Sequence, residues 1–311
     1  MTRPSGSPSL VWLAVLLLPS VVGGDEGKTL LRWKLRAGDD LKLQITQTNT
    51  METLVKDRPL VMAVQMAMEL AWHVDRVESD GTARVAQLFT RVLVKTSGQE
   101  AKSVQYDSSS ASAPPLEMQE LAQAVRRLLG TQCQVTLSAR GEITDVKPAP
   151  ETDSLLRHAP GAAGLLRLLT KAGINQTLRP ALGLLPQSPV ASGNTWHDTF
   201  AIDAPAGKIR LATTYTYQGP ERLQDRSVER IGVATEVTAA PEESRPGETA
   251  APVRQQYNGT LFFDASLGQL VQSELQQTAL SEAAYHDKTV QLKASNTVVL
   301  RIRIREGGNS P

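Results

Sequence analysis

Alternating apolar and polar residues over long stretches are the main pattern of this sequence. From Met62 to Val74 every second residue is apolar, while the residues between them include Gln65, Glu69 and His73. A β-strand turns successive side chains to opposite faces, so this stretch predicts a strand of about 13 residues with one apolar face. At the usual rise such a strand is about 40 Å long, which favours a curved sheet or half-barrel.

The same alternation predicts long partner strands. Residues 39–53 and 82–96 are expected to flank the Met-rich strand, with a turn at Ser79-Asp80-Gly81. Residues 288–305 predict a closing strand with one buried face. The pattern is therefore that of an antiparallel, β-rich protein.

Two hairpins of the same plan indicate an internal repeat. Residues 257–278 carry two β-prone runs around Asp264-Ala265-Ser266 and Gly268, and residues 132–146 repeat this plan around Gly141. The strands that precede each hairpin follow in the same order. We therefore expect the chain to consist of two related units.

Apolar residues at helical spacing occur between these strands. Pro114-Pro115 opens a predicted helix that ends near Leu129, and the leucines of residues 154–185 predict two or three short helices, broken at Gly173 and Pro180 among other positions. These helices are expected to cover the open face of a sheet. The expected fold class is β-rich α+β, with two related units of long curved antiparallel strands, half-barrel-like, and covering helices.

The first residues have the features of a secretory signal peptide. Arg3 supplies a positive charge, residues 10–22 are apolar, and Val22-Gly23-Gly24 provides small residues for cleavage. The apolar run of about 13 residues is too short to span a bilayer. We expect an exported protein, periplasmic or secreted, without a transmembrane segment in its mature chain.

Four segments are expected along the chain. They are a signal peptide at residues 1–24, a first β-rich unit at 25–150, a helical connector at 151–190 and a second β-rich unit at 191–311.

Charge and cysteine content narrow the range of partners. Without residues 1–24 the chain has 32 basic and 32 acidic residues, because that segment holds one basic residue and no acidic one. A neutral chain lacks the basic surface that binds nucleic acid or anionic lipid. The single cysteine, Cys133, lies in an apolar strand and is expected to be buried.

The usual catalytic and metal-binding patterns are absent from the sequence. The four histidines are widely spaced, and there is no Gly-x-Ser-x-Gly elbow or phosphate-binding glycine loop. His197 and Asp198 are adjacent, but neighbours in a strand point to opposite faces. We therefore expect no catalytic residue, no metal site and no cofactor, and a protein that is not an enzyme.

Several short motifs resemble a known family. Residues 192–196 (SGNTW), residues 214–217 (TYTY) and residues 259–264 (GTLFFD), with Gly268, are similar to a family of uncharacterised exported proteins known mainly from planctomycete-type bacteria. That family has no assigned activity, so the resemblance implies an exported location and a β-rich architecture. By architecture, long strands with covering helices are also similar to bacterial lipoprotein-carrier half-barrels.

The apolar face of the Met-rich strand is the feature that suggests a function. Thioether side chains adapt to irregular apolar shapes, so Met62, Met66 and Met68 beside Trp72 are candidate ligand-binding residues for an apolar or lipid-like molecule. The same face could instead be solid core. Two alternatives stay open: an envelope structural or protein-interaction module that binds an envelope protein, and a hydrolase that uses scattered carboxylates.

Overall fold

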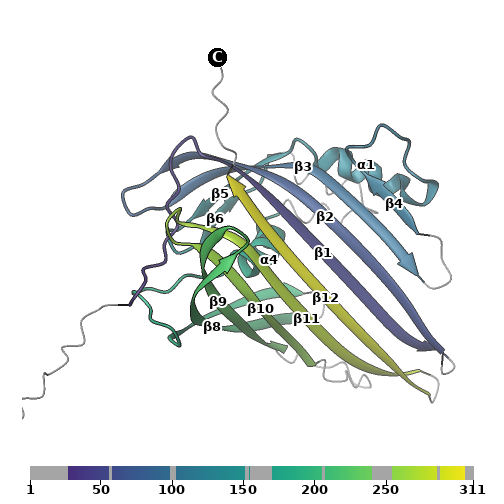
Figure 1. Cartoon of the computed structure of the whole chain (residues 1–311). Helices are drawn as coiled ribbons and strands as arrows, with labels where there is room; N and C mark the ends of the chain where they lie inside the picture. The colour runs from purple at the N-terminus through teal and green to yellow at the C-terminus, as the bar shows by residue number, and fades with distance from the viewer. Residues whose placement is uncertain are drawn as a thin grey trace, which may run out of the picture.

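Within the residues that it describes, the computed structural model of this chain contains twelve strands (Figure 1). It describes residues 27–55, 58–98, 103–150, 154, 170–204, 207–239, 254–285 and 288–304. The expected signal peptide at residues 1–24 lies outside this part, as do residues 155–169, where further helices are expected.

The strands of the first half follow the predicted alternation. They are β1 (Asp40–Val55), β2 (Arg58–Val77), β3 (Ala83–Gly98), β4 (Val104–Asp107), β5 (Gln132–Leu137) and β6 (Ile143–Lys147). In β1 the apolar Leu41, Leu43 and Ile45 are buried, while Lys42 between them is exposed. We call the face that carries these three residues the inner face of the sheet.

The second half contributes strands of similar length. They are β7 (Thr195–Ala204), β8 (Gly207–Leu223), β9 (Arg226–Ala239), β10 (Arg254–Asp264), β11 (Gln269–Tyr285) and β12 (Lys288–Ile304). The predicted hairpin at residues 257–278 is present as β10 and β11. Its turn is organised by Asp264, whose Oδ1 accepts hydrogen bonds from the backbone N–H groups of Ser266 and Leu267 at 3.0 and 2.9 Å.

All strands join one antiparallel sheet. Its order is β6-β5-β3-β2-β1-β12-β11-β10-β9-β8-β7, with β4 paired to β3 beside this path. The first and last strands pair in the middle, with Leu41 opposite Ile304, and β6 and β7 lie at the two ends of the order. The β-rich fold with two sets of long antiparallel strands is confirmed, whereas the domain boundaries stay a prediction.

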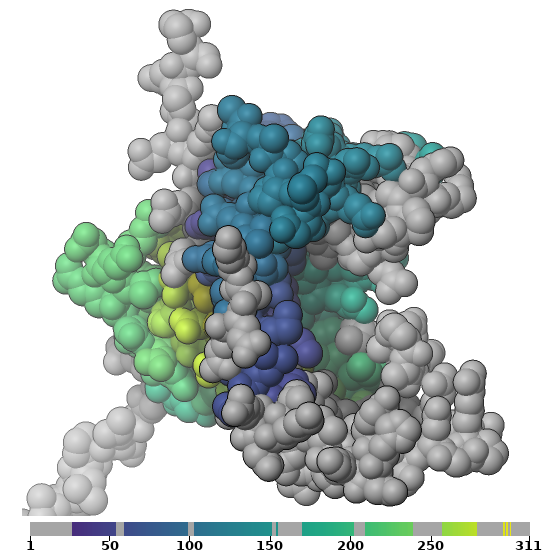
Figure 2. Space-filling view, turned by 90° about the vertical axis from the view of Figure 1, so that its right-hand side faces the viewer, coloured from purple at the N-terminus to yellow at the C-terminus, as the bar shows by residue number. Residues whose placement is uncertain are grey.

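The described helices lie in two connections, between β4 and β5, which both pair with β3, and between β6 and β7, which lie at the two ends of the sheet order. They are the short 3₁₀ helix η1 (Leu116–Met118), α1 (Gln119–Leu128) and α4 (Lys171–Leu182). Figure 2 shows the region around α1 (blue-green) above β1 and β2 (purple to blue). Figure 1 shows α4 within the curve of the sheet, where it contacts β6, β7, β11 and β12.

Helix α4 continues through two residues that were expected to break it. Thr170 caps its start by accepting a hydrogen bond from the Gly173 backbone N–H at 3.1 Å. Pro180 lies in the last turn, so it removes only the hydrogen bond to the Gln176 carbonyl. The predicted breaks at Gly173 and Pro180 are therefore wrong, because burial of one helix face outweighs these local preferences.

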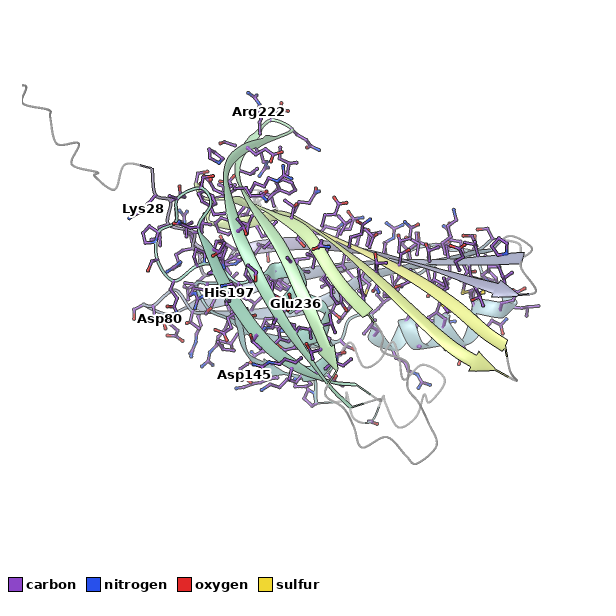
Figure 3. The ribbon with its side chains drawn as sticks, turned by 90° about the horizontal axis from the view of Figure 1, so that it is seen from below. Lys28, Asp80, Asp145, His197, Arg222 and Glu236 are labelled. Carbon is purple, nitrogen blue, oxygen red and sulfur yellow. The ribbon has the colours of Figure 1, made fainter. Side chains whose placement is uncertain are left out.

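Residues 27–39 form an N-terminal strap across one end of the sheet. The backbone N–H of Trp33 donates to the carbonyl of Ala139 in the β5–β6 turn, and that of Lys34 donates to Gly268 in the β10–β11 turn, both at 2.8 Å. Trp33 itself is only 4% exposed. In Figure 3 the labelled Lys28 of this strap and Asp80 of the β2–β3 turn lie on the same side of the molecule. The strap thus connects turns from both halves of the chain.

Candidate functional site

A cavity of about 250 Å³ lies between α4 and the inner face of the sheet. The described residues that line it come from α4 and from β1, β7, β8, β9, β10 and β11. Its main apolar contributors are Ile45, Phe200, Leu211, Tyr215, Val233 and Leu275. A concave, mostly apolar space with a few polar groups is the usual form of a small-molecule site.

Four polar residues form a row across the wall of this cavity. Thr213 of β8 lies opposite Thr235 of β9, Thr235 opposite Tyr257 of β10, and Tyr257 opposite Gln277 of β11. The two threonine hydroxyls hydrogen-bond each other at 2.9 Å, and the side chains of Tyr257 and Gln277 also hydrogen-bond. Burial raises the pKa of the Tyr257 phenol, so this group stays neutral. We call these four residues the polar row.

An ion pair between α4 and β7 stands at one end of this row. Asp198 lies opposite Thr213 and accepts hydrogen bonds from the Arg179 guanidinium at 3.0 to 3.3 Å. The same guanidinium lies 4.6 Å from the ring centre of Phe200, a cavity residue. Arg179 and Asp198 are 22% and 10% exposed, so each charge depends on the other for compensation.

Aromatic stacking closes the cavity near the end of α4. The rings of Trp196 and Tyr215 stack with centroids 5.5 Å apart, and the Trp196 indole N–H donates to the Leu184 carbonyl at 2.6 Å. Burial strongly raises the pKa of the Tyr215 phenol. Gly183 ends the helix at a φ of 67°, and a Cβ there would collide with Leu261. The backbone approaches the sheet closely at this point.

The four residues singled out from the sequence lie on the inner face but outside the lining of this cavity. Met68 and Trp72 are each 1% exposed within the core, and Met66 packs partly buried against it. Met62 is 54% exposed at the far end of the same strand face. Met66 lies directly opposite Gln47, which does line the cavity. A ligand-binding role for these four residues stays a prediction.

Trp72 is held by a buried hydrogen bond. Its indole N–H donates to Gln87 Oε1 at 2.8 Å, and Gln87 is 1% exposed. Gln87→Leu is expected to lower the free energy of unfolding by about 1–3 kcal/mol, because it leaves the indole N–H without a partner. Urea unfolding measures this change. An unchanged stability would mean that the indole finds another acceptor.

The remaining candidate groups do not converge on a second site. His73 hydrogen-bonds Asp40 at 2.8 Å, and its pKa is raised by that contact, yet both side chains are more than half exposed. Burial raises the pKa of the Cys133 thiol to about 11. His158 and His286 lie outside the described residues. Within the described ranges no three His, Cys, Asp or Glu side chains are grouped to hold a metal ion.

Comparison with known proteins places the chain in no family. No family model and no curated protein matches it. The resemblance to planctomycete-type exported proteins therefore stays a prediction. Among the described helices, none is both long enough and apolar enough to cross a membrane.

Solved structures offer only remote likenesses. A lipovitellin structure is 13% identical, with a TM-score of 0.46 over 89% of this chain but 27% of that chain. A putative outer membrane lipoprotein-sorting protein domain from Vibrio parahaemolyticus is 9% identical over 86% of this chain and 87% of that chain, with a TM-score of 0.18. A DUF1329 family protein from Desulfovibrio piger is 10% identical over 88% of both chains, with a TM-score of 0.18. At these values no function transfers to this chain.

The polar row could not be found from the sequence. Its residues lie on four strands, and only the register of those strands makes them neighbours. Thr213 stands in an alternating stretch that predicts a strand, so its inward direction is readable from the sequence. Tyr257 and Gln277 occupy the predicted hairpin. The sequence does not give the register in which that hairpin pairs with β9, because residues 240–253 between them carry no regular pattern.

Proposed function

We propose that this protein is an exported, non-enzymatic binding protein that holds an apolar or lipid-like molecule between α4 and the inner face of the sheet. The observation that carries this proposal is the 250 Å³ cavity, whose described lining is mainly apolar and lies beneath a single helix. A solid structural module would fill this space with side chains, since protein interiors are close-packed.

The size of the cavity sets the scale of the expected affinity. At about 30 Å³ per water-sized unit, the cavity holds about eight heavy atoms of a ligand. Burial of eight methylene groups contributes about 6 kcal/mol, and the cost of association reduces this gain, so a ligand that fills the cavity alone should bind with a dissociation constant no lower than about 10–100 µM. A longer ligand would extend along the inner face.

The inner face offers such an extension towards the tips of β1 and β2. Met51 lies opposite Met62 there, and the two side chains are 48% and 54% exposed. Leu60, on the same strand, is 40% exposed. Exposed apolar side chains that lie next to one another can serve as an interaction surface. In this proposal Met62 and Met66 contact the part of the ligand that leaves the cavity.

Filling the cavity tests the proposal. Thr177→Trp places a large ring in the cavity from α4, and it is expected to weaken binding of the apolar fluorophore N-phenyl-1-naphthylamine by about tenfold or more. Fluorescence titration of the purified protein measures the affinity, and a thermal melt checks the fold.

Ala172→Trp serves as the matched control. Ala172 lies on the same helix but is exposed, so this variant is expected to bind the fluorophore as the unchanged protein does. The proposal fails if the unchanged protein binds neither the fluorophore nor an added long-chain alcohol. It also fails if Thr177→Trp folds and binds both with unchanged affinity.

A further inference from the structure

The cavity combines an apolar wall with several neutral polar groups. Besides the polar row, Gln47 of β1 and Gln176 and Thr177 of α4 contribute amide and hydroxyl groups to its lining. Thr213 and Thr235 are only 5% and 9% exposed, so their hydroxyls lie deep in the sheet wall. Groups of this kind donate and accept hydrogen bonds without carrying charge.

The described lining residues include no Lys, Arg, His, Asp or Glu. The cation on this side of α4, Arg179, is held by Asp198 through hydrogen bonds from Nε and Nη2 and lies over the Phe200 ring. Among the described residues beside the cavity, Arg179 could supply a counter-charge to an anionic ligand only if this pair broke. Otherwise its charge would be buried without compensation, which is strongly unfavourable.

We propose that the cavity selects an uncharged amphiphile, such as a long-chain alcohol or a glycerol ester, over a carboxylate or a phosphate ester of the same chain length. This inference rests on the proposed function and names the class of ligand for that site. The apolar wall takes the chain, and the polar row with Gln47 and Gln176 hydrogen-bonds a hydroxyl or ester oxygen.

Two ligands of equal chain length separate the charge preference from general apolar binding. Displacement of N-phenyl-1-naphthylamine by 1-decanol is expected to occur at about 100-fold lower concentration than displacement by decanoate at pH 8. For a carboxyl group with an ordinary pKa of about 4, the protonated, neutral fraction increases as the pH falls. If the neutral acid binds as decanol does and the anion about 100-fold more weakly, the apparent affinity for decanoate should rise only about twofold between pH 8 and pH 6 but about tenfold between pH 8 and pH 5, while that for decanol stays constant.

A double variant tests the role of the polar row. Thr213→Val with Thr235→Val removes both hydroxyls of one hydrogen-bonded pair, so neither partner is left unsatisfied and the fold should be kept. We expect decanol to bind about fivefold more weakly, while the fluorophore binds as before. Thr216→Val, on the opposite face of β8, is the control and should leave both affinities unchanged.

Each outcome has a distinct meaning. Decanoate that binds at pH 8 as tightly as decanol overturns the preference for uncharged ligands and leaves the proposed binding function standing. Unchanged decanol affinity in the folded double variant overturns the assignment of the polar row. If neither the fluorophore nor any decyl compound binds, both the inference and the proposed function are wrong.

Discussion

Met68→Arg is expected to prevent the protein from folding. Met68 is 1% exposed on the inner face, opposite Ile45 of β1 and Val92 of β3, which are also buried. A void of only about 10 Å³ separates it from Leu178 on α4 and its neighbours. A guanidinium there would be buried without a partner, so we expect a loss of at least about 4 kcal/mol of stability. Soluble yield, circular dichroism and a thermal melt measure the effect.

Met62→Arg is the matched control for this prediction. It changes the same residue type on the same face of β2, six positions away, where the side chain is 54% exposed. This variant should fold with a melting transition close to that of the unchanged protein. Met66 is partly buried, so the stability of Met66→Arg should lie between those of Met68→Arg and Met62→Arg. A cooperative melt for Met68→Arg would mean that water reaches this part of the inner face.

Trp33→Ala is expected to produce the second large loss of stability. Trp33 is 4% exposed in the N-terminal strap and packs edge-on against Phe263 of β10, with ring centroids 6.2 Å apart. Removal of a buried indole leaves a cavity, so the free energy of unfolding should fall by about 3–5 kcal/mol. Urea unfolding measures the change.

Trp33→Phe separates packing from hydrogen bonding at this position. Within the part of the chain that the structure describes, the buried indole N–H of Trp33 has no hydrogen-bond partner. Phenylalanine keeps a ring against Phe263 and removes the unsatisfied N–H group. Trp33→Phe should therefore lower the free energy of unfolding much less than Trp33→Ala does. Equal losses for the two variants would contradict this account and would indicate a hidden acceptor for the indole.

Much of the fold could be predicted because strand periodicity is local. The alternation at Leu41, Leu43 and Ile45 places three buried residues of β1 on one face, as the structure has them. The hairpin around Asp264 was also predictable, since turn residues and flanking β-prone runs are close in sequence. The extent of α4 could not be predicted in this way, because Gly173 and Pro180 are local helix breakers whose effect is overcome by tertiary packing.

The candidate site was harder to predict than the fold. The sequence pattern marks Met68 and Trp72 as inward, and they are, but an inward side chain can belong to a filled core or to a cavity. The space beneath α4 lies between the helix and side chains of six strands that together leave it unfilled. Such a mismatch between surfaces depends on three-dimensional packing and leaves no local signal.

The pairing of the first strand with the last has a consequence for biosynthesis. β1 is complete early, but its partner β12 is translated only after all other described strands. Until then one edge of β1 presents unpaired N–H and C=O groups, which readily join the strands of other chains. Contacts between such distant segments also form slowly. A chaperone that keeps the nascent chain unfolded would therefore protect it, and a product that stops before Lys288 should aggregate through the exposed edges of β1 and β11.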